Sequence, residues 1–134
     1  MNRRVVAGAI VDEHHHRLLL AQRERPAKVA GLWELPGGKV EPGETDAQAL
    51  RRELTEELGI ICTVGDQLTG EVDLGSEMVL VARYAQIESG EPSASEHRAL
   101  RWVDPAELLA LAQAEKMVPA DTIWVGQLIA KLEQ

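Results

Sequence analysis

The sequence predicts a single α+β domain in which helices pack on a mixed β-sheet. Three observations support this fold class. Short apolar segments bounded by polar residues recur along the chain, as is typical of strands. In two longer segments, a residue that is typical of a helix N-cap is followed by apolar residues at helical spacing. No internal repeat, low-complexity segment or linker interrupts the 134 residues, so residues 1–134 are expected to form one domain.

The first 44 residues predict two strands and a long connection. Residues 4–12 (RVVAGAIVD) and 17–23 (RLLLAQR) are the expected strands, and EHHHR between them is a turn. His14–His16 could form a metal-binding tract, but an exposed hairpin tip is the simpler interpretation. Residues 24–44 are rich in glycine and proline, with one short strand expected around Leu32–Leu35. Connections of this length usually have a functional role.

A helix is expected from about Asp46 to Leu58. Thr45 is the predicted N-cap, and Gln48, three positions later, completes a capping box. Gly59 is the expected residue just beyond the helix. The buried stripe of this helix is expected to consist of apolar residues three and four apart: Ala47, Leu50, Leu54 and Leu58.

The rest of the chain predicts four strands and two helices. The strands are IICTVG, QLTGEVDL, EMVLVARYAQI and RALRWVD, with turns at Gly65-Asp66, Gly75-Ser76 and Ser89–Pro92. The segment DPAELLALAQ is expected to begin a helix with Asp104 as N-cap and Pro105 at the first helical position. Residues 118–134 read as an amphipathic helix capped near Asp121.

Composition excludes several classes of function. The chain has 14 basic and 22 acidic residues and a net charge of −8, which argues against a partner that is a nucleic-acid polymer or an anionic membrane surface. No apolar stretch approaches the roughly 20 residues that span a bilayer. Cys62 is the only cysteine, so no intrachain disulfide can form. We therefore expect a cytoplasmic protein that acts on a small molecule, as a monomer or a homodimer.

Three carboxylates near the end of the central helix stand out. Glu53, Glu56 and Glu57 repel one another at spacings of three and four, at the helix terminus whose dipole disfavours negative charge. They lie beside the leucine stripe, so water screens them poorly. A hard divalent cation with oxygen ligands would relieve this repulsion. The alternative is a solvated helix face that Arg51 and Arg52 balance.

The spacing around these carboxylates resembles the Nudix box, the signature of the Nudix hydrolases. From Gly38 to Ile60 the chain spans 23 residues and fills all nine specified positions. The segments LLLAQRERP, GLWELPGGKV, EHRALRWV and VPAD are similar to the MutT branch of that family, most of all to its CTP pyrophosphohydrolases and 8-oxo-dGTP diphosphatase-like members. The resemblance implies an α/β/α sandwich around a mixed sheet.

The resemblance also implies a metal site and a catalytic loop. Mg²⁺, or Mn²⁺, would be bound by carboxylates of the box with help from the Gly37 carbonyl, and Glu96 would be a further ligand or a general base. Glu44 could pair with Arg52 and tie the loop to the helix. The resulting catalytic and metal-binding candidates are Gly37, Glu44, Arg52, Glu53, Glu56, Glu57 and Glu96.

Substrate contacts are implied at five further positions. Arg23 and Lys39 would contact phosphates, although both could be ordinary surface charges. Asp121 matches the position that reads the base, and the base-site candidates are Asp121, Glu34 and Leu35, with Glu34 also near the metal. An ionised aspartate only accepts hydrogen bonds, which suits an amine such as N4 of cytosine. The competing interpretation is that Asp121 only caps the last helix.

The function expected from these features is metal-dependent hydrolysis of a nucleoside triphosphate to a monophosphate and pyrophosphate. The expected substrates are cytidine-type or oxidised-guanine triphosphates, and the expected role is cleansing of the nucleotide pool. One alternative is a pyrophosphatase of nucleoside diphosphate sugars such as ADP-ribose. Another is a nucleotide-sensing domain that does not cleave, but such domains usually lose box carboxylates, and here the box is intact.

Overall fold

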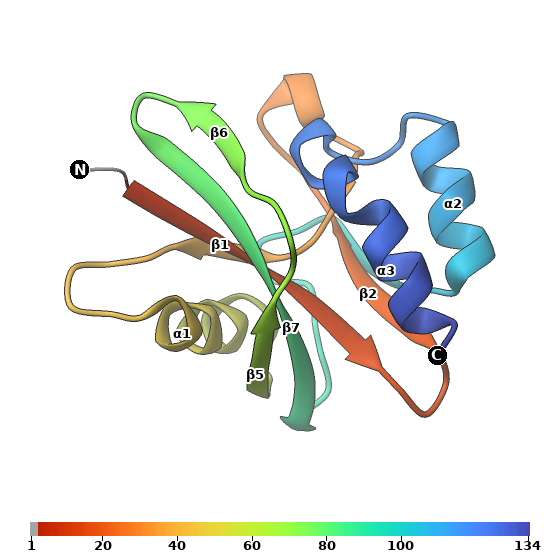
Figure 1. The fold of residues 1–134 in the computed structure, drawn as a ribbon, viewed down its shortest axis with the longest axis horizontal. Helices are drawn as coiled ribbons and strands as arrows, with labels where there is room; N and C mark the ends of the chain where they lie inside the picture. Colours follow the sequence, from red (N-terminus) through yellow and green to blue (C-terminus); the bar gives the residue numbers. More distant parts are fainter. Residues whose placement is uncertain (1–2) are drawn as a thin grey trace.

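The computed structural model describes residues 3–134, which form a mixed β-sheet between two layers of helix (Figure 1). The strands are β1 (Arg3–Asp12), β2 (Arg17–Gln22), β3 (Trp33–Glu34), β4 (Gly37–Lys39), β5 (Ile61–Gln67), β6 (Val72–Gly75), β7 (Met78–Ser89) and β8 (Ala99–Val103). The α-helices are α1 (Asp46–Leu58), α2 (Pro105–Gln113) and α3 (Val125–Leu132), and two short 3₁₀ helices are η1 (Ala27–Val29) and η2 (Pro119–Trp124). The expected α+β class and α/β/α sandwich are confirmed.

Strand β1 is the centre of the sheet. It runs parallel to β7 along eight paired positions, from Arg3 opposite Met78 to Ile10 opposite Ala85. On its other side it pairs antiparallel with β2 and with β4. Strands β5 and β6 extend the sheet from β7, and β3 and β8 extend it from β2. The glycine-rich β4 therefore lies directly against the central strand.

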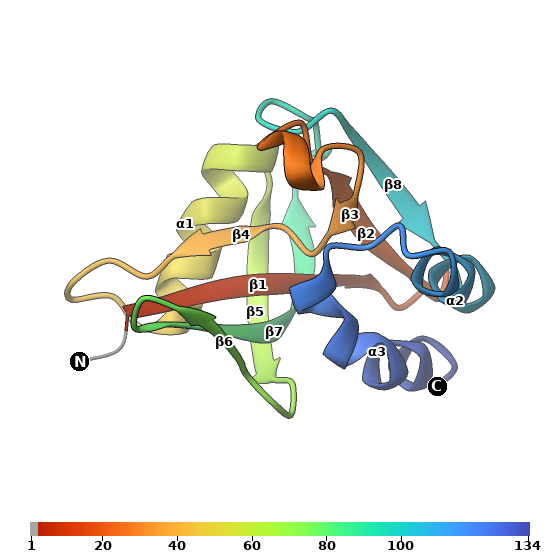
Figure 2. The same cartoon turned by 90° about the horizontal axis from the view of Figure 1, so that it is seen from above.

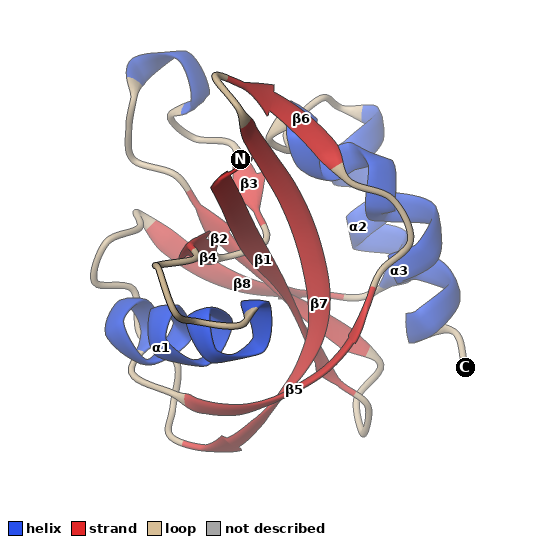
Figure 3. Ribbon diagram, turned by 60° about the vertical axis from the view of Figure 1, so that its left-hand side comes forward, coloured by secondary structure: helices blue, strands red, loops and turns tan. Residues whose placement is uncertain are grey.

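The sheet buries a separate apolar cluster on each face. Side chains alternate along a strand, so β1 sends Val6 and Ile10 to one face and Ala7, Ala9 and Val11 to the other. Helix α1 covers the first face, whereas α2 and α3 cover the second (Figures 2 and 3). Leu50, Leu54 and Leu58 of α1 and Trp124 of η2 are fully buried.

The central helix begins and ends as predicted. The Thr45 hydroxyl accepts a hydrogen bond from the Gln48 backbone N–H, and the Gln48 side-chain oxygen accepts one from the Thr45 backbone N–H, so the capping box is confirmed. Gly59 follows the helix with φ of 72°, a left-handed conformation that favours glycine. One detail of the stripe is wrong: Ala49 is fully buried, whereas Ala47 is only partly buried. The buried face of α1 is therefore wide enough to include both Ala49 and Leu50, which are successive residues about 100° apart around the helix axis.

Two expectations for the middle strands are also wrong. No turn occurs at Gly65-Asp66, because β5 continues through these residues to Gln67. Between Val64 and Gln67 the strand advances by three residues while its partner β7 advances by two, from Ala85 to Arg83, as in a β-bulge. Residues 68–71 do not join a strand either. Leu68 still donates its backbone N–H to the Ala82 carbonyl of β7, but Thr69 bonds to the helical layer: its backbone N–H donates to Gln127 and its carbonyl accepts from Gln127 and from the Trp124 indole.

The glycine- and proline-rich connection contains more structure than predicted, and the C-terminal segment, predicted as one helix, is divided into two kinds of helix. Residues 24–44 hold η1, the predicted short strand as β3, and a second strand, β4. The C-terminal segment begins as η2 and becomes α-helical only at Val125, where no side chain caps the helix. Asp121 is buried inside η2, so the prediction that it caps the last helix is wrong. Among residues 3–134, no helix is long and apolar enough to cross a membrane; a cytoplasmic location stays a prediction.

Candidate active site

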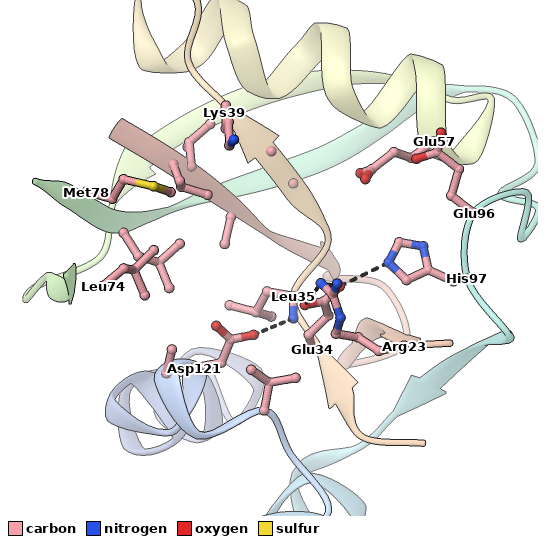
Figure 4. A pocket seen from close by; sticks show the side chains of 18 of the residues that line it. Arg23, Glu34, Leu35, Lys39, Glu57, Leu74, Met78, Glu96, His97 and Asp121 are labelled. Carbon is pink, nitrogen blue, oxygen red and sulfur yellow. Dashed lines mark hydrogen bonds and ion pairs between the residues drawn. The ribbon is translucent and has the colours of Figure 1, made fainter. Parts of the chain in front are cut away.

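A cavity of about 660 Å³ lies beside β4 and the central strand. Its volume is in the usual range for a small-molecule site. Figure 4 shows its arrangement: Glu57, Glu96 and His97 lie at one end, and Leu74 and Met78 lie at the other. Eight residues that the sequence singles out line this cavity: Arg23, Glu34, Leu35, Gly37, Lys39, Glu57, Glu96 and Asp121.

The remaining candidates, Glu44, Arg52, Glu53 and Glu56, do not line this cavity, and Arg52 contacts the other three. This guanidinium donates to Glu44 at 2.8 and 2.9 Å, to Glu53 at 2.9 Å and to the Lys39 carbonyl at 3.1 Å. The expected pairing of Glu44 with Arg52 is therefore present. The Arg52 hydrogen bonds, helped by the Glu41 backbone N–H, lower the pKa of Glu44 to about 2.

The three box carboxylates differ in their surroundings. The Glu56 side chain is 60% exposed and reaches Arg52 only at 3.4 Å, whereas the Glu53 side chain is 18% exposed. Glu57 has one carboxylate oxygen, Oε2, that is buried and bonded to no protein group. Burial, followed by the charges of Glu53 and Glu96, raises the pKa of Glu57 to about 8. Burial also raises the pKa of Glu53, although Arg52 opposes the shift.

These residues fit a divalent cation by their chemistry. Among residues 3–134, no three His, Cys, Asp or Glu side chains converge closely enough to form a ready-made metal cluster. Glu57 nevertheless presents an unpaired, buried carboxylate oxygen, and Glu53 and Glu96 both act on its charge. A buried anion without a partner is costly, and a hard cation with oxygen ligands relieves it.

The two glycines of β4 leave room for this acidic end. A Cβ atom at Gly37 would overlap the carbonyl oxygen of Val6, and one at Gly38 would overlap the Glu53 carboxylate. Any side chain at either position would therefore displace the strand pairing or the carboxylate. The close approach of β4 to both β1 and α1 requires glycine here.

Arg23, Glu34 and His97 form a chain of polar contacts in the cavity wall. Arg23 Nη1 lies 3.2 and 3.3 Å from the two carboxylate oxygens of Glu34, and His97 Nε2 lies 3.0 Å from Oε2 of Glu34. His97 is not among the residues that the sequence singles out. Its position directly after Glu96 in the segment EHRALRWV was the available signal.

Asp121 is only 4% exposed, and its side chain holds the backbone of the loop that it faces. Its Oδ2 accepts the Leu35 backbone N–H at 2.8 Å, and Leu35 itself is buried. Burial raises the pKa of Asp121 to about 7; the Leu35 hydrogen bond opposes the shift and Glu34 adds to it. Asp121 lies on the cavity side of η2, opposite the acidic end (Figure 4).

Comparisons with known proteins agree with this arrangement. The model of the NUDIX domain matches residues 1–123. A Mycobacterium tuberculosis protein that is named, provisionally, 8-oxo-dGTP diphosphatase 2 is 46% identical, covering 98% of this chain and 92% of its own. The CTP pyrophosphohydrolase of Escherichia coli is 44% identical over 85% of each chain.

A solved structure supports the same relationship. The solution structure of the E. coli ORF135 protein matches with a TM-score of 0.71 and 39% identity, over 99% of this chain and 88% of that one. The domain model, the near full-length relatives and this structural match agree with the glycine-supported acidic cavity beside α1. On these grounds, the chain belongs to the NUDIX family.

Proposed function

We propose that the protein is a metal-dependent nucleoside triphosphate pyrophosphohydrolase, which converts a triphosphate and water to a monophosphate and pyrophosphate. The observation that carries this proposal is the unpaired, buried Oε2 of Glu57 at the acidic end of a cavity of about 660 Å³. The names of the M. tuberculosis and E. coli relatives support the class of reaction, hydrolysis of phosphoric anhydrides. Such a reaction needs charge neutralisation near the phosphates.

The proposed cofactor is Mg²⁺, with Mn²⁺ as a possible substitute. The groups proposed to hold it are Glu53, Glu56, Glu57, Glu96 and the Gly37 carbonyl. A bound divalent cation neutralises phosphate charge and makes water more acidic. Within the protein, Arg52 holds Glu53 and the loop residue Glu44 in place, and Glu96 or an α1 glutamate takes the proton from the attacking water.

Positive charge for the phosphates is proposed to come from Arg23 and Lys39. Both line the cavity. Arg23 is aimed by its contacts with Glu34, whereas Lys39 extends from the exposed end of β4 next to the acidic helix. An arginine held by a carboxylate keeps further N–H donors for phosphate oxygens, because its guanidinium has five.

The base is proposed to bind at Asp121, with Leu35 and Glu34 beside it. Oδ2 of Asp121 is occupied by the Leu35 backbone, which leaves Oδ1 for a ligand. When ionised, Asp121 accepts a hydrogen bond from an exocyclic amine. The proposed substrates are therefore (d)CTP-type nucleotides or 8-oxo-dGTP, whose bases offer such donors, and the proposed role is nucleotide-pool sanitation.

Domain organisation, oligomeric state and location complete the proposal. We propose that residues 1–134 act as one domain, as a monomer or a homodimer, on a small-molecule nucleotide in the cytoplasm. The net charge of −8 supports a substrate held through a cation rather than a polyanionic partner.

A substrate screen with Mg²⁺ tests the function. The panel holds the common nucleoside triphosphates, 8-oxo-dGTP and ADP-ribose, and each reaction is assayed separately for pyrophosphate and for orthophosphate. Pyrophosphate release from a triphosphate, lost in Glu53→Gln, is the expected result. Cleavage of ADP-ribose alone would replace the proposal with the diphosphate-sugar activity. Tight nucleotide binding without cleavage would replace it with a sensing role.

A further inference from the structure

His97 and Glu34 meet in the cavity wall although they lie 63 positions apart in the chain. Their side chains are only 7% and 14% exposed, and Nε2 lies 3.0 Å from Oε2. A carboxylate only accepts hydrogen bonds, so Nε2 of His97 donates to it. The contact is therefore a charge-assisted hydrogen bond shielded from water, which is stronger than a neutral one at the surface.

Glu34 is shared between His97 and Arg23, and the strand pairing explains why the three residues meet. Arg23 directly follows β2, Glu34 ends β3, and His97 lies just before β8. Gln22 of β2 pairs with Trp33 of β3 on one side and with Ala99 of β8 on the other. The same end of three adjoining strands therefore carries all three side chains (Figure 4).

The other ring nitrogen of His97 makes the contact unlike a simple structural bond. Nδ1 is buried and has no hydrogen-bond partner. A buried polar atom without a partner lowers stability, so the imidazole is not placed for stability alone. Figure 4 shows His97 between the Arg23–Glu34 pair on one side and Glu57 and Glu96 on the other.

We infer that His97 is a positioning residue that fixes the Glu34 carboxylate and, through it, the direction of Arg23. This inference rests on the proposed function, in which Arg23 contacts the phosphates. Without the imidazole, Glu34 gains rotamers, and the remaining bond of Arg23 Nε to the Arg25 carbonyl, at 2.9 Å, does not set the direction of Nη1. Displacements of about 1 Å are enough to cost large factors in rate or binding.

Three substitutions at His97 test the inference, because amide side chains imitate the two ring nitrogens separately. The Gln amide nitrogen reaches about as far as Nε2, whereas the shorter Asn places its amide near Nδ1. With full-length protein, Mg²⁺ and the best triphosphate of the screen, His97→Gln should keep KM within about threefold. His97→Asn and His97→Ala should raise KM about tenfold or more. His14→Gln, at the exposed hairpin tip, is the control for a His-to-Gln change.

A double-mutant cycle supplies a second measurement. Glu34→Gln removes the charge that His97 and Arg23 share, so adding His97→Ala to it should change kcat/KM much less than His97→Ala alone. Melting temperatures of all variants report their folding independently of activity.

The outcomes separate this inference from the function on which it rests. Three results would overturn the positioning role but not the proposed function. They are an unchanged KM in His97→Ala, a loss in kcat alone in all three variants, and effects of Glu34→Gln and His97→Ala on kcat/KM that are independent of each other. No turnover of any nucleotide by the unmodified protein would overturn the proposed function itself, and the inference with it.

Discussion

Arg52 holds Glu44 with two hydrogen bonds, of 2.8 and 2.9 Å, although Glu44 lies in the loop before the helix that carries Arg52. The same guanidinium also donates to Glu53 and to the Lys39 carbonyl. One side chain therefore joins the loop, β4 and an acidic residue of α1. The planar fork of arginine is suited to this task, because it donates in several fixed directions at once.

The first prediction is that lysine cannot replace Arg52. Arg52→Lys keeps the charge but loses the two-pronged contact, so the loop and Glu53 should be less well placed and kcat should fall about tenfold or more. The melting temperature should change little because the pair is near the surface. Steady-state kinetics and thermal melts measure both effects. Arg51→Lys, on the exposed side of the same helix, is the matched control; equal kinetics in the two variants would contradict the role of Arg52.

The second prediction concerns Glu53 and Glu57, the two less exposed carboxylates of the box. Glu53→Gln and Glu57→Gln should each reduce turnover by about a hundredfold or more, because an amide is a poor ligand for a hard cation. The fold should survive, which circular dichroism checks. Glu133→Gln, an exposed glutamate at the far end of the chain, is the control and should retain activity. Full activity of the unmodified protein in excess EDTA would defeat the proposal.

Thermal stability gives a third prediction, which needs no substrate. Glu57 is held close to Glu53 and Glu96 without a compensating partner for Oε2. A ligand that binds only the folded state stabilises it by mass action, so Mg²⁺ should raise the melting temperature at concentrations that saturate activity. The increase should shrink in Glu57→Gln. NaCl at matched ionic strength controls for screening, and an equal effect of the two salts would show that relief of repulsion is the wrong explanation.

Local signals made the central helix predictable to the residue. Thr45, Gln48 and Gly59 act through contacts within one or two turns, so sequence spacing alone locates the helix ends. The mixed sheet was also predictable as a class from its short apolar segments. By contrast, the end of β5 and the segment around Thr69 are set by partners far away in the chain, Arg83 and Gln127, which a local pattern does not reveal.

In the candidate site, too, local signals were predictable and contacts between residues far apart in the chain were not. The spacing of the glutamates identified the acidic helix, and the resemblance located the loop and cavity residues. Neither could show that Asp121 bonds to the Leu35 backbone instead of capping α3, because the two residues are 86 positions apart. His97 was missed for a similar reason, since its partner Glu34 lies on another strand. Long-range polar contacts need the assembled fold.

The fourth prediction follows from the buried position of Asp121. Its pKa of about 7 in the folded protein lies above its ordinary 3.8, so the folded state binds this proton more tightly than the unfolded chain. The group imposes no penalty below about pH 4, and ionisation then costs stability progressively until about pH 7. The full difference corresponds to at most about 4 kcal/mol.

Asp121→Asn removes that ionisation while its amide oxygen can still accept the Leu35 N–H. The melting temperature of the Asn variant, relative to the unmodified protein, should therefore rise between about pH 4 and about pH 7 and level off above. Asp66→Asn, at an exposed site on β5, should show no comparable trend. A difference that does not vary with pH would mean that folding does not raise the pKa of Asp121.

The last prediction concerns the choice of base. Above about pH 7, ionised Asp121 offers only an acceptor, because Oδ2 is taken by Leu35 and Oδ1 bears no proton. Cytosine presents N4 as a donor, whereas uracil presents O4, an acceptor that would face the carboxylate unpaired. We expect roughly tenfold or greater preference for dCTP over dUTP at about pH 8. At about pH 6 protonated Asp121 can also donate, so the preference should weaken.

The ratio of kcat/KM for dCTP and dUTP measures this preference, and titrations that both substrates share cancel in it. Asp121→Asn should give a smaller ratio with no change between the two pH values, because its amide oxygen stays on the Leu35 N–H and its NH2 group, which only donates at either pH, takes the place of Oδ1. 8-oxo-dGTP is the third substrate, since its ring N1 and exocyclic amine are also donors. Equal use of dCTP and dUTP by the unmodified protein at both pH values, or an unaltered ratio in the Asn variant, would confine Asp121 to holding the Leu35 backbone.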